Sequence, residues 1–273
     1  MTNILAIDKL SFKYNKKTIL KDISFTTDPG EFISIIGPNG SGKTTLIKII
    51  SKINKPEKGK IYIKGKDIQT MSNRQLARHI AVVMQSVEPV SMSVEEYVLL
   101  GRLPFFKKYQ FFETTKDIRL AHKYMELTGV LKLKDASINE ISGGERQLAA
   151  IARALTQEPE LLILDEPTSH LDITHQVQIL ELLKTLTKTL NLTVLMVIHD
   201  LNMAAEYSDR LVLLNGKNGT IYQTGPCEQV MTEKSIQDVY NTKVRIQKNP
   251  ESDKPCIFII NQSTSNKKKD AFL

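Results

Sequence analysis

The alternation of apolar and polar residues changes character along the chain, and its first part is rich in strands. Short β-rich runs crowd the first forty residues, and a hairpin-like piece follows the first helical pattern. That helical pattern begins at Thr44 and ends at the "PEKG" of residues 56–59. The predicted strand runs are 4–7, 23–27, 31–37 and 59–68. This order predicts a partly antiparallel sheet, with a consecutive strand, turn and helix in it.

Helical spacing dominates the middle of the chain. Between about residues 87 and 140 the apolar residues recur at helical spacing without a strand pattern, which predicts a helical subdomain. Afterwards helices and strands alternate, and this favours a parallel sheet with helical crossovers. The strands are predicted at 161–164, 194–198, 210–214 and 219–225, with helices ending at 155 and spanning 174–190 and 201–207. From Pro226 onward we expect two short helices and a final strand at 254–260.

Composition narrows the class of protein. An apolar content of 41% in 273 residues is ordinary for a globular core of one large or two small domains. The apolar runs fall far short of the roughly 18 residues that cross a bilayer. Asp8 and Lys9 interrupt the first run, so we expect an untargeted, cytoplasmic protein. Cys227 and Cys256 have no metal-type spacing, which argues against a zinc site or a disulfide framework.

The net charge of +7 is compatible with nucleic acid, an anionic membrane surface or phosphate-rich ligands, and it does not choose among them. Aromatic residues make up only 6% and Trp is absent, which weakens an interpretation based on base stacking. The basic tail, residues 263–273, is typical of a frayed end.

The most informative motif is "GPNGSGKTT", residues 37–45, which fits the phosphate-loop template between a strand and a helix. Its glycines let successive N–H groups point at a β-phosphate. Lys43 supplies charge to the β- and γ-phosphates, and the Thr44 hydroxyl suits Mg²⁺. The predicted ATP-binding residues here are Gly37, Pro38, Asn39, Gly40, Ser41, Gly42, Lys43, Thr44 and Thr45.

Three further strand ends carry polar groups that face the same crevice of an α/β sheet. Asp165 and Glu166 end an apolar strand; Asp165 suits Mg²⁺, and Glu166 is placed to deprotonate the attacking water. His199 ends another strand, where it favours contact with the γ-phosphate. Gln85 ends a third, and its amide is within expected reach of Mg²⁺ or the water. Alone, each has an ordinary structural alternative; the phosphate loop favours the functional one.

One motif lacks a partner in this scheme. "ISGGERQ", residues 141–147, opens a helix with exposed N–H groups suited to an anion, but no phosphate-binding lysine accompanies it. Together with the phosphate loop and the polar strand ends, it resembles the ATP-binding-cassette ATPases over nearly the whole chain. The resemblance implies that Ser142, Gly143 and Gly144 bind the γ-phosphate of ATP held by the opposite protomer of a homodimer.

The resemblance also implies the architecture. We expect a P-loop NTPase (RecA-like) α/β core with an N-terminal antiparallel β-subdomain and an inserted helical subdomain at about 87–142. The ATPase domain is expected at 1–240, and a C-terminal extension with the basic tail at 241–273. Tyr14 is at the family's adenine-stacking position, and Asp172 belongs to the "SHLD" loop at the dimer interface. Ile141, where the family usually has leucine, is a conservative departure.

A finer resemblance is to the cassettes of importers for iron-siderophore complexes, haem and cobalamin. It rests on residues 94–105, 166–176 and 199–214. It implies an ATPase at the cytoplasmic face of the membrane, using ATP and Mg²⁺, beneath membrane permease subunits. A periplasmic or surface solute-binding protein acts indirectly, and no nucleic acid is expected.

The aromatic cluster belongs to either a docking surface or the packing of the helical subdomain. Its members are Phe105, Phe106, Tyr109, Phe111 and Phe112. Two other function classes also stay open: a non-transport cassette acting on nucleic acid, ribosomes or a scaffold, which the basic charge favours mildly, and a regulatory module that hydrolyses little ATP.

Overall fold

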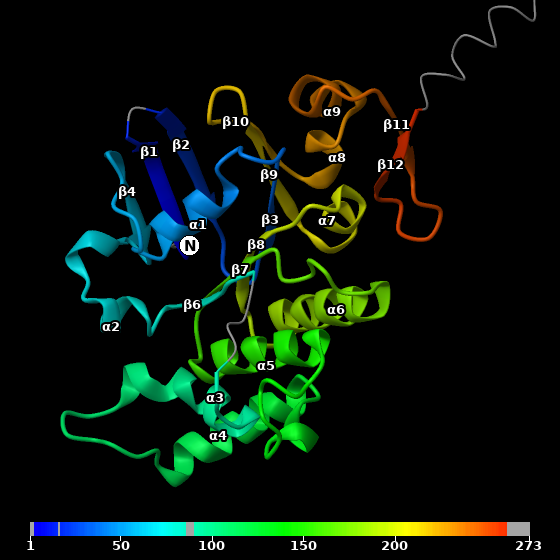
Figure 1. Ribbon diagram of the computed structural model, residues 1–273. Helices are drawn as coiled ribbons and strands as arrows, with labels where there is room; N and C mark the ends of the chain where they lie inside the picture. The colour runs from blue at the N-terminus through cyan, green and yellow to red at the C-terminus, as the bar shows by residue number, and fades with distance from the viewer. Residues whose placement is uncertain (1–2, 16, 86–89, 261–273) are drawn as a thin grey trace, which may run out of the picture.

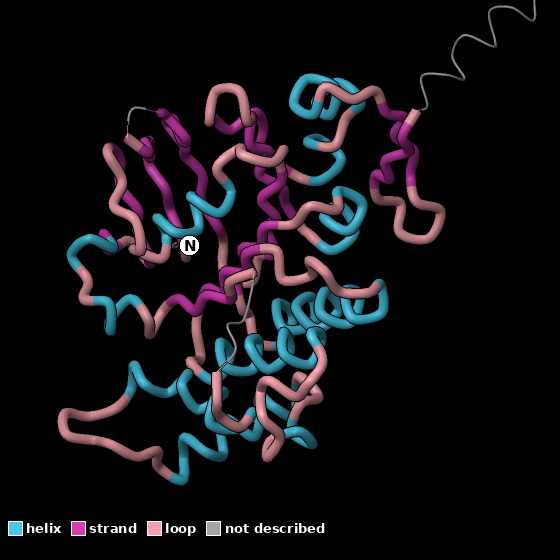
Figure 2. The backbone as a smooth tube through the Cα atoms, in the orientation of Figure 1, coloured by secondary structure: helices cyan, strands magenta, loops and turns pink. Residues whose placement is uncertain are grey.

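The computed structural model describes residues 3–15, 17–85 and 90–260, and helix α1 (Lys43–Ile50) lies between two large sheets (Figures 1 and 2). The first sheet is antiparallel, with strand order β2-β1-β4-β5. Its strands are β1 (Leu5–Tyr14), β2 (Lys17–Thr27), β4 (Lys58–Ile63) and β5 (Lys66–Asp67). The predicted antiparallel sheet and hairpin-like piece are confirmed.

The second sheet has the strand order β10-β9-β3-β8-β7-β6, and only the β9–β10 pair is antiparallel among its described strands. Its central strands are buried on both faces, which is the reason for their unbroken apolar sequences. The strands are β3 (Phe32–Ile36), β6 (Ile80–Val83), β7 (Leu161–Asp165), β8 (Thr193–Val197), β9 (Arg210–Asn215) and β10 (Thr220–Gly225). The predicted parallel sheet with helical crossovers is confirmed.

Two apolar cores pack on the opposite faces of this sheet. One joins it to α1 and the antiparallel sheet, and the other joins it to α5 (Gly143–Thr156), α6 (Ile173–Thr189) and α7 (Leu201–Tyr207). The leucine-rich face of α6 belongs to the core: Ile179, Leu183 and Leu186 are buried, and Leu182 is half-buried. The short helices α2 (Asn73–Leu76) and η1 (Ile68–Thr70) connect β5 to β6.

Between β6 and α5 the described chain is helical. It contains α3 (Val94–Leu99), η2 (Leu100–Phe105), α4 (Thr115–Leu127) and η3 (Leu131–Leu133), which pack against α5 at the bottom of Figure 1. Buried Arg102 holds the base of the η2–α4 loop: it donates to Asp117 Oδ1 at 2.9 Å and to the Thr156 carbonyl at 2.9 Å, and it stacks on Phe105.

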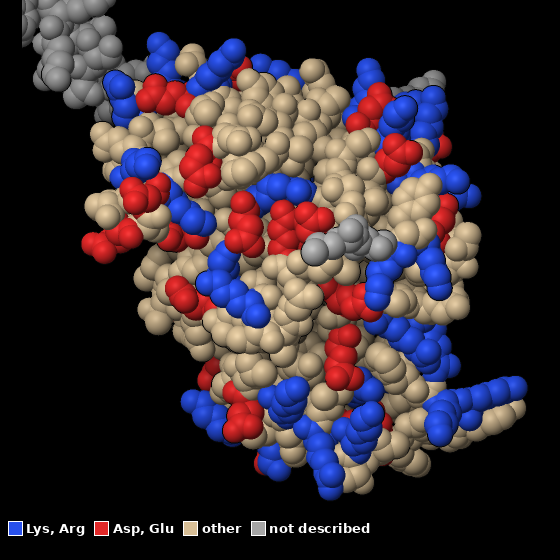
Figure 3. All heavy atoms as spheres, turned by 180° about the vertical axis from the view of Figure 1, so that it is seen from behind, with Lys and Arg blue, Asp and Glu red and all other residues tan. Residues whose placement is uncertain are grey.

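The tip of that loop is exposed. Tyr109, Phe111 and Phe112 are 78%, 79% and 81% exposed, so internal packing does not explain these three rings. On the face that Figure 3 shows, acidic and basic side chains are interspersed above, and basic ones gather along the lower edge. We name residues 103–113 the aromatic loop.

The C-terminal region differs from the sequence prediction in one element. The helices α8 (Cys227–Val230) and α9 (Glu233–Tyr240) and the strand β12 (Pro255–Ile259) are as predicted, but β12 pairs with an unpredicted strand, β11 (Val244–Lys248). We name the two strands the C-terminal hairpin.

Helix α1 ends at Ile50, earlier than the "PEKG" signal indicates. The basic tail lies outside the described residues, and the division at residue 240 stays a prediction.

Candidate functional site

The parallel pairing of β3, β8 and β7 brings three strand ends to one edge of the sheet. Ile35 and Asp165 both pair with Val197, so the chain leaves the three strands at the same level. Gly37 follows β3, Glu166 follows β7, and His199 comes two residues after β8. The sequence predicts that these residues face one crevice. The register of the sheet therefore assembles the candidate site.

The loop after β3 has the geometry of an anion cradle. Gly40 and Gly42 have φ of 78° and 95°, a region that favours glycine, and Gly42 packs against β2 so closely that a Cβ would lie 2.7 Å from Leu20 Cδ2. Lys43 Nζ donates to the carbonyls of Gly37 and Pro38 at 2.8 and 3.2 Å, spanning the loop. Helix α1 begins at Lys43, so its positive end faces the cradle.

Burial shifts the pKa values of both Lys43 and Asp165 in the direction of the neutral form. Burial lowers the pKa of Lys43, and the charges of Glu166 and Asp165 counteract this. Burial raises the pKa of Asp165, while its hydrogen bond from Thr44 Oγ1 at 3.3 Å opposes the shift. A bound phosphate together with a cation would add the countercharges that both groups lack.

Thr44 and Asp165 are suited to Mg²⁺, which prefers oxygen ligands and keeps several waters. The Thr44 hydroxyl and the Asp165 carboxylate lie side by side, and among the described residues no cluster of three or more His, Cys, Asp or Glu side chains could hold a metal. Gln85 donates its amide to Glu166, so its predicted place among the metal ligands rests on its sequence position.

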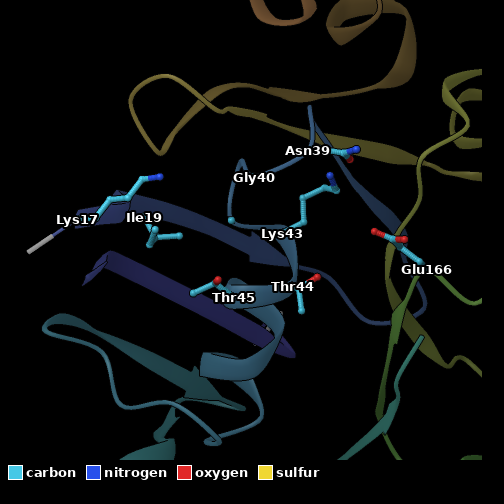
Figure 4. Close-up of a pocket in the computed structure, with 9 residues that line it drawn as sticks. Lys17, Ile19, Asn39, Gly40, Lys43, Thr44, Thr45 and Glu166 are labelled. Atoms are coloured by element: carbon cyan, nitrogen blue, oxygen red, sulfur yellow. The ribbon is translucent and has the colours of Figure 1, made fainter. Parts of the chain in front are cut away.

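Glu166 is the centre of a hydrogen-bonded group. Its Oε1 pairs with His199 Nε2, and its Oε2 accepts from Gln85 Nε2 at 2.9 Å. Its φ of 51° turns the side chain away from the strand direction, and its N–H donates to the Val197 carbonyl at 3.1 Å. The structure thus brings three of the four predicted catalytic residues into direct contact, and Lys43 lies across the cavity (Figure 4).

The cavity beside this group has a volume of about 380 Å³. Two of its residues, Lys17 and Ile19 of β2, were not predicted, because strand residues give no local signal for a site. Tyr14 is not part of the lining: it stacks edge-on against Phe12, and its hydroxyl accepts from Asn54 at 2.9 Å. The lining is Lys17, Ile19, Asn39, Gly40, Gly42, Lys43, Thr44, Thr45 and Glu166.

Among the described residues, those at the start of α5 do not line that cavity. Ser142 is the N-cap of α5 in a capping box with Glu145, and the pKa of Glu145 is lowered by the hydrogen bonds from Ser142. Gly144 lies against the ring of His175, which Asp172 holds through Nδ1 at 2.8 Å. The starts of α5 and α6 thus form one exposed surface that makes no contact with the cavity of its own chain.

The arrangement binds a phosphate-bearing ligand on one side and activates a nucleophile on the other. Lys43 and the glycine amides supply positive charge, and the Glu166 carboxylate can take a proton from water. The surface that carries Ser142 and Gly143 can offer further N–H groups to an anion outside this cavity.

Comparison with known proteins agrees with this chemistry. Residues 20–169 match the sequence model of the family described as ABC transporter. The iron(3+)-hydroxamate import ATP-binding protein FhuC of Bacillus subtilis is 37% identical, over 93% of each chain. The ferric enterobactin transport ATP-binding protein FepC of Escherichia coli is 34% identical, over 95% of this chain and 96% of that protein.

Solved structures show the same fold. A chain from an ABC transporter assigned to the metal-chelate type, in an inward-facing conformation, superposes with a TM-score of 0.83 at 26% identity, covering 97% of this chain and all of that one. A dimeric ATP-binding cassette bound to ADP and phosphate after hydrolysis superposes with a TM-score of 0.70 at 28% identity, covering 81% of this chain and 98% of that one.

The packing of Gly144 gives a test of the α5 surface. Alanine at a helical glycine usually stabilises by up to about 1 kcal/mol. Here the new Cβ would lie 2.3 Å from the His175 ring, and overpacking of this kind costs about 1–3 kcal/mol. We expect Gly144→Ala to lower the unfolding free energy in urea denaturation. In a His175→Ala background the same change should raise it.

Gly143→Ala is the matched control, since its Cβ would meet only Leu171 Cδ2 at 3.8 Å, an ordinary contact. Equal effects of Gly144→Ala with and without His175 would contradict the packing described here.

Proposed function

We propose that this chain, which belongs to the ABC transporter family of ATP-binding proteins, energises import of an iron-siderophore complex, or a related haem or cobalamin-type ligand. The chain is an ATPase of this family, with the family's fold. The observation that carries the mechanism is the Glu166 carboxylate, bonded to both His199 and Gln85 at the edge of the phosphate cradle.

The roles of the residues follow from their places. Lys43 and the loop amides bind the β- and γ-phosphates, and Glu166 takes the proton from the water that attacks in line with the leaving oxygen. His199 holds Glu166 in place and lies at the γ-phosphate. Thr44 and Asp165 would hold Mg²⁺, which would supply positive charge to the phosphates. Tyr14 lies at the end of β1, outside the cavity lining but paired with Lys17 of that lining, and we infer that its exposed ring stacks on the adenine.

The finished site needs a second copy of the chain. In a homodimer, the α5 surface of one protomer covers the nucleotide of the other, so that Ser142, Gly143 and Gly144 complete the cradle and Asp172 lies at the interface. The dimeric post-hydrolysis cassette among the solved structures supports this arrangement. The contact to the γ-phosphate is lost with ADP, and this difference in binding free energy is what drives reopening.

The partner in transport is a membrane permease. No helix among residues 3–15, 17–85 and 90–260 is long and apolar enough to cross a bilayer. We place the chain at the cytoplasmic face, with the aromatic loop as part of the surface that docks on the permease. Exposed rings next to the exposed Lys107 and Lys108 fit an apolar and acidic partner segment. Gln85, which precedes the helical segment and bonds to Glu166, links this surface to the chemistry.

The class of transported ligand comes from the relatives. FhuC and FepC are named for different siderophores, a hydroxamate and enterobactin, and both match this chain over most of its length. A cassette common to such different ligands does not select among them, so selection belongs to the permease and an external solute-binding protein. The rival function, a cassette acting on nucleic acid, has less support because charges of both signs are mixed on the face of Figure 3.

The base assignment is tested by Glu166→Gln. The amide keeps the shape and removes the base, so we expect ATP binding to persist while turnover falls about 10³-fold. Glu160→Gln is the matched control, because Glu160 lies at the opposite end of β7 and pairs with Lys64. Phosphate release and nucleotide binding are measured for both. Turnover of Glu166→Gln within about tenfold of the native value would exclude Glu166 as the base.

The shared site is tested by mixing two inactive variants. Lys43→Ala removes the cradle lysine, and Ser142→Arg blocks the α5 surface. In a mixed dimer one site has both an intact cradle and an intact surface. We expect turnover in an equal mixture to recover to about a quarter of the native value, since half of the dimers are mixed and each has one intact site. An unchanged baseline on mixing would show that the site does not form between subunits.

The partner is tested by purification from membranes. We expect a tagged chain to retain a permease with several membrane spans. Phe111→Ser with Phe112→Ser should weaken this at least about tenfold, as loss of interface anchors does, without changing the ATP turnover of the isolated chain. Leu190→Ser, at an exposed residue just after α6, is the control. Co-purification of RNA or DNA in place of a permease would support the rival function.

A further inference from the structure

The C-terminal hairpin is the part of the chain that the mechanism above leaves unused. It forms a separate two-stranded sheet, paired from Val244 with Ile259 to Lys248 with Pro255. A lone hairpin has marginal stability in water, so its order requires support from a neighbouring element. Two helices provide this support: β12 packs against α7, on the right of Figure 1, and β11 packs against α9.

At the start of α7, the Asn202 side chain bonds directly to the backbone of the hairpin. Its Oδ1 accepts from the Ile257 N–H at 2.7 Å, and its Nδ2 donates to the Ile257 carbonyl at 3.3 Å. The amide thereby pairs with the free edge of β12 as a neighbouring strand would. The Ile257 N–H and carbonyl are both bonded by the same amide group, so the two hydrogen bonds together fix the direction of the start of α7 relative to the hairpin.

The hairpin also forms hydrogen bonds with residues at the other end of α7. Glu206 accepts from Asn249 at 3.2 Å and from Ser252 at 2.7 Å, and Lys254 donates to the Ser208 carbonyl at 3.0 Å. Helix α7 has seven residues, too few for stability alone, so its orientation is set by these contacts and by its buried Ala204 and Ala205.

The start of α7 is close in the chain to His199. Asp200 caps the helix by accepting from the Met203 N–H, and His199, which bonds to Glu166, is the residue before it. The imidazole is 45% exposed, so packing around the ring does not hold it in place. Its position depends on the backbone of residues 198–201, between the end of β8 and the start of α7.

We propose that Asn202 is a positioning residue for His199, through which the C-terminal hairpin holds the imidazole against Glu166. The inference rests on the proposed role of His199 in ATP hydrolysis. Without the bonds to Ile257, the start of α7 loses its direct bonds to the hairpin while the contacts at its other end remain, and the imidazole loses its fixed orientation. The phosphate cradle is on other elements and is unaffected. The loss therefore falls on the chemical step and not on nucleotide binding.

The test is a double-mutant cycle of ATP turnover with native chain, Asn202→Ala, His199→Ala and the double variant. We expect Asn202→Ala to lower kcat about tenfold with KM for ATP within about twofold, and to have no further effect once His199 is removed. Asn202→Asp keeps the acceptor for the Ile257 N–H, so its loss should be intermediate. It also provides a second variant if the alanine form folds poorly.

Ser252→Ala is the matched control, since Asn249 still bonds to Glu206 at that end of α7; we expect its kcat to stay within about twofold of the native value. Thermal unfolding is recorded for every variant. An unchanged kcat for Asn202→Ala, or the same fractional loss with and without His199, would overturn the inference. Native turnover in His199→Ala would instead overturn the proposed role of His199.

Discussion

Backbone hydrogen bonding between the parallel strands β3, β8 and β7 is the constraint on which the site depends. Because Ile35 and Asp165 pair with the same residue of β8, the phosphate loop, the carboxylates and His199 leave the sheet at one level. A shift of one residue in either pairing would move a strand end by about 3.3 Å and turn its side chains to the other face. The strands are buried on both faces, so such a shift would also disrupt the packing of the core. The packing of the core therefore fixes the same strand register that the site needs.

Under the proposed function, one chain holds only part of the nucleotide site. The cradle and the proposed base are on one edge of the sheet, whereas the start of α5 lies on a separate surface beside His175 and Asp172. Covering ATP with the surface of a second chain makes the affinity between subunits depend on the γ-phosphate. A nucleotide bound entirely within one chain would give no such dependence, and hydrolysis would then do no work on a permease.

The parts of the site that the sequence predicts are those with a local signal. The spacing of residues 37–45 and the carboxylates after an apolar strand specify backbone conformations and strand ends, so they can be recognised without the fold. Lys17 and Ile19 give no such signal, because they reach the cavity only through the pairing of β2 and its packing on Gly42. Strand β11 was missed because "VRIQK" is short and half charged, and it is held by pairing with β12 and contacts with α9.

Glu166 connects two regions that are far apart in the sequence. One carboxylate oxygen accepts from Gln85, which precedes the helical segment and its aromatic loop, and the other pairs with His199, which precedes α7 and the hairpin. A carboxylate has a fixed angle between its oxygens, so displacing either donor rotates or releases the group and changes the other bond as well. Under the proposed function, a partner docked at the helical segment and the C-terminal hairpin would act on the same two oxygens, and both would determine how readily the carboxylate meets the attacking water.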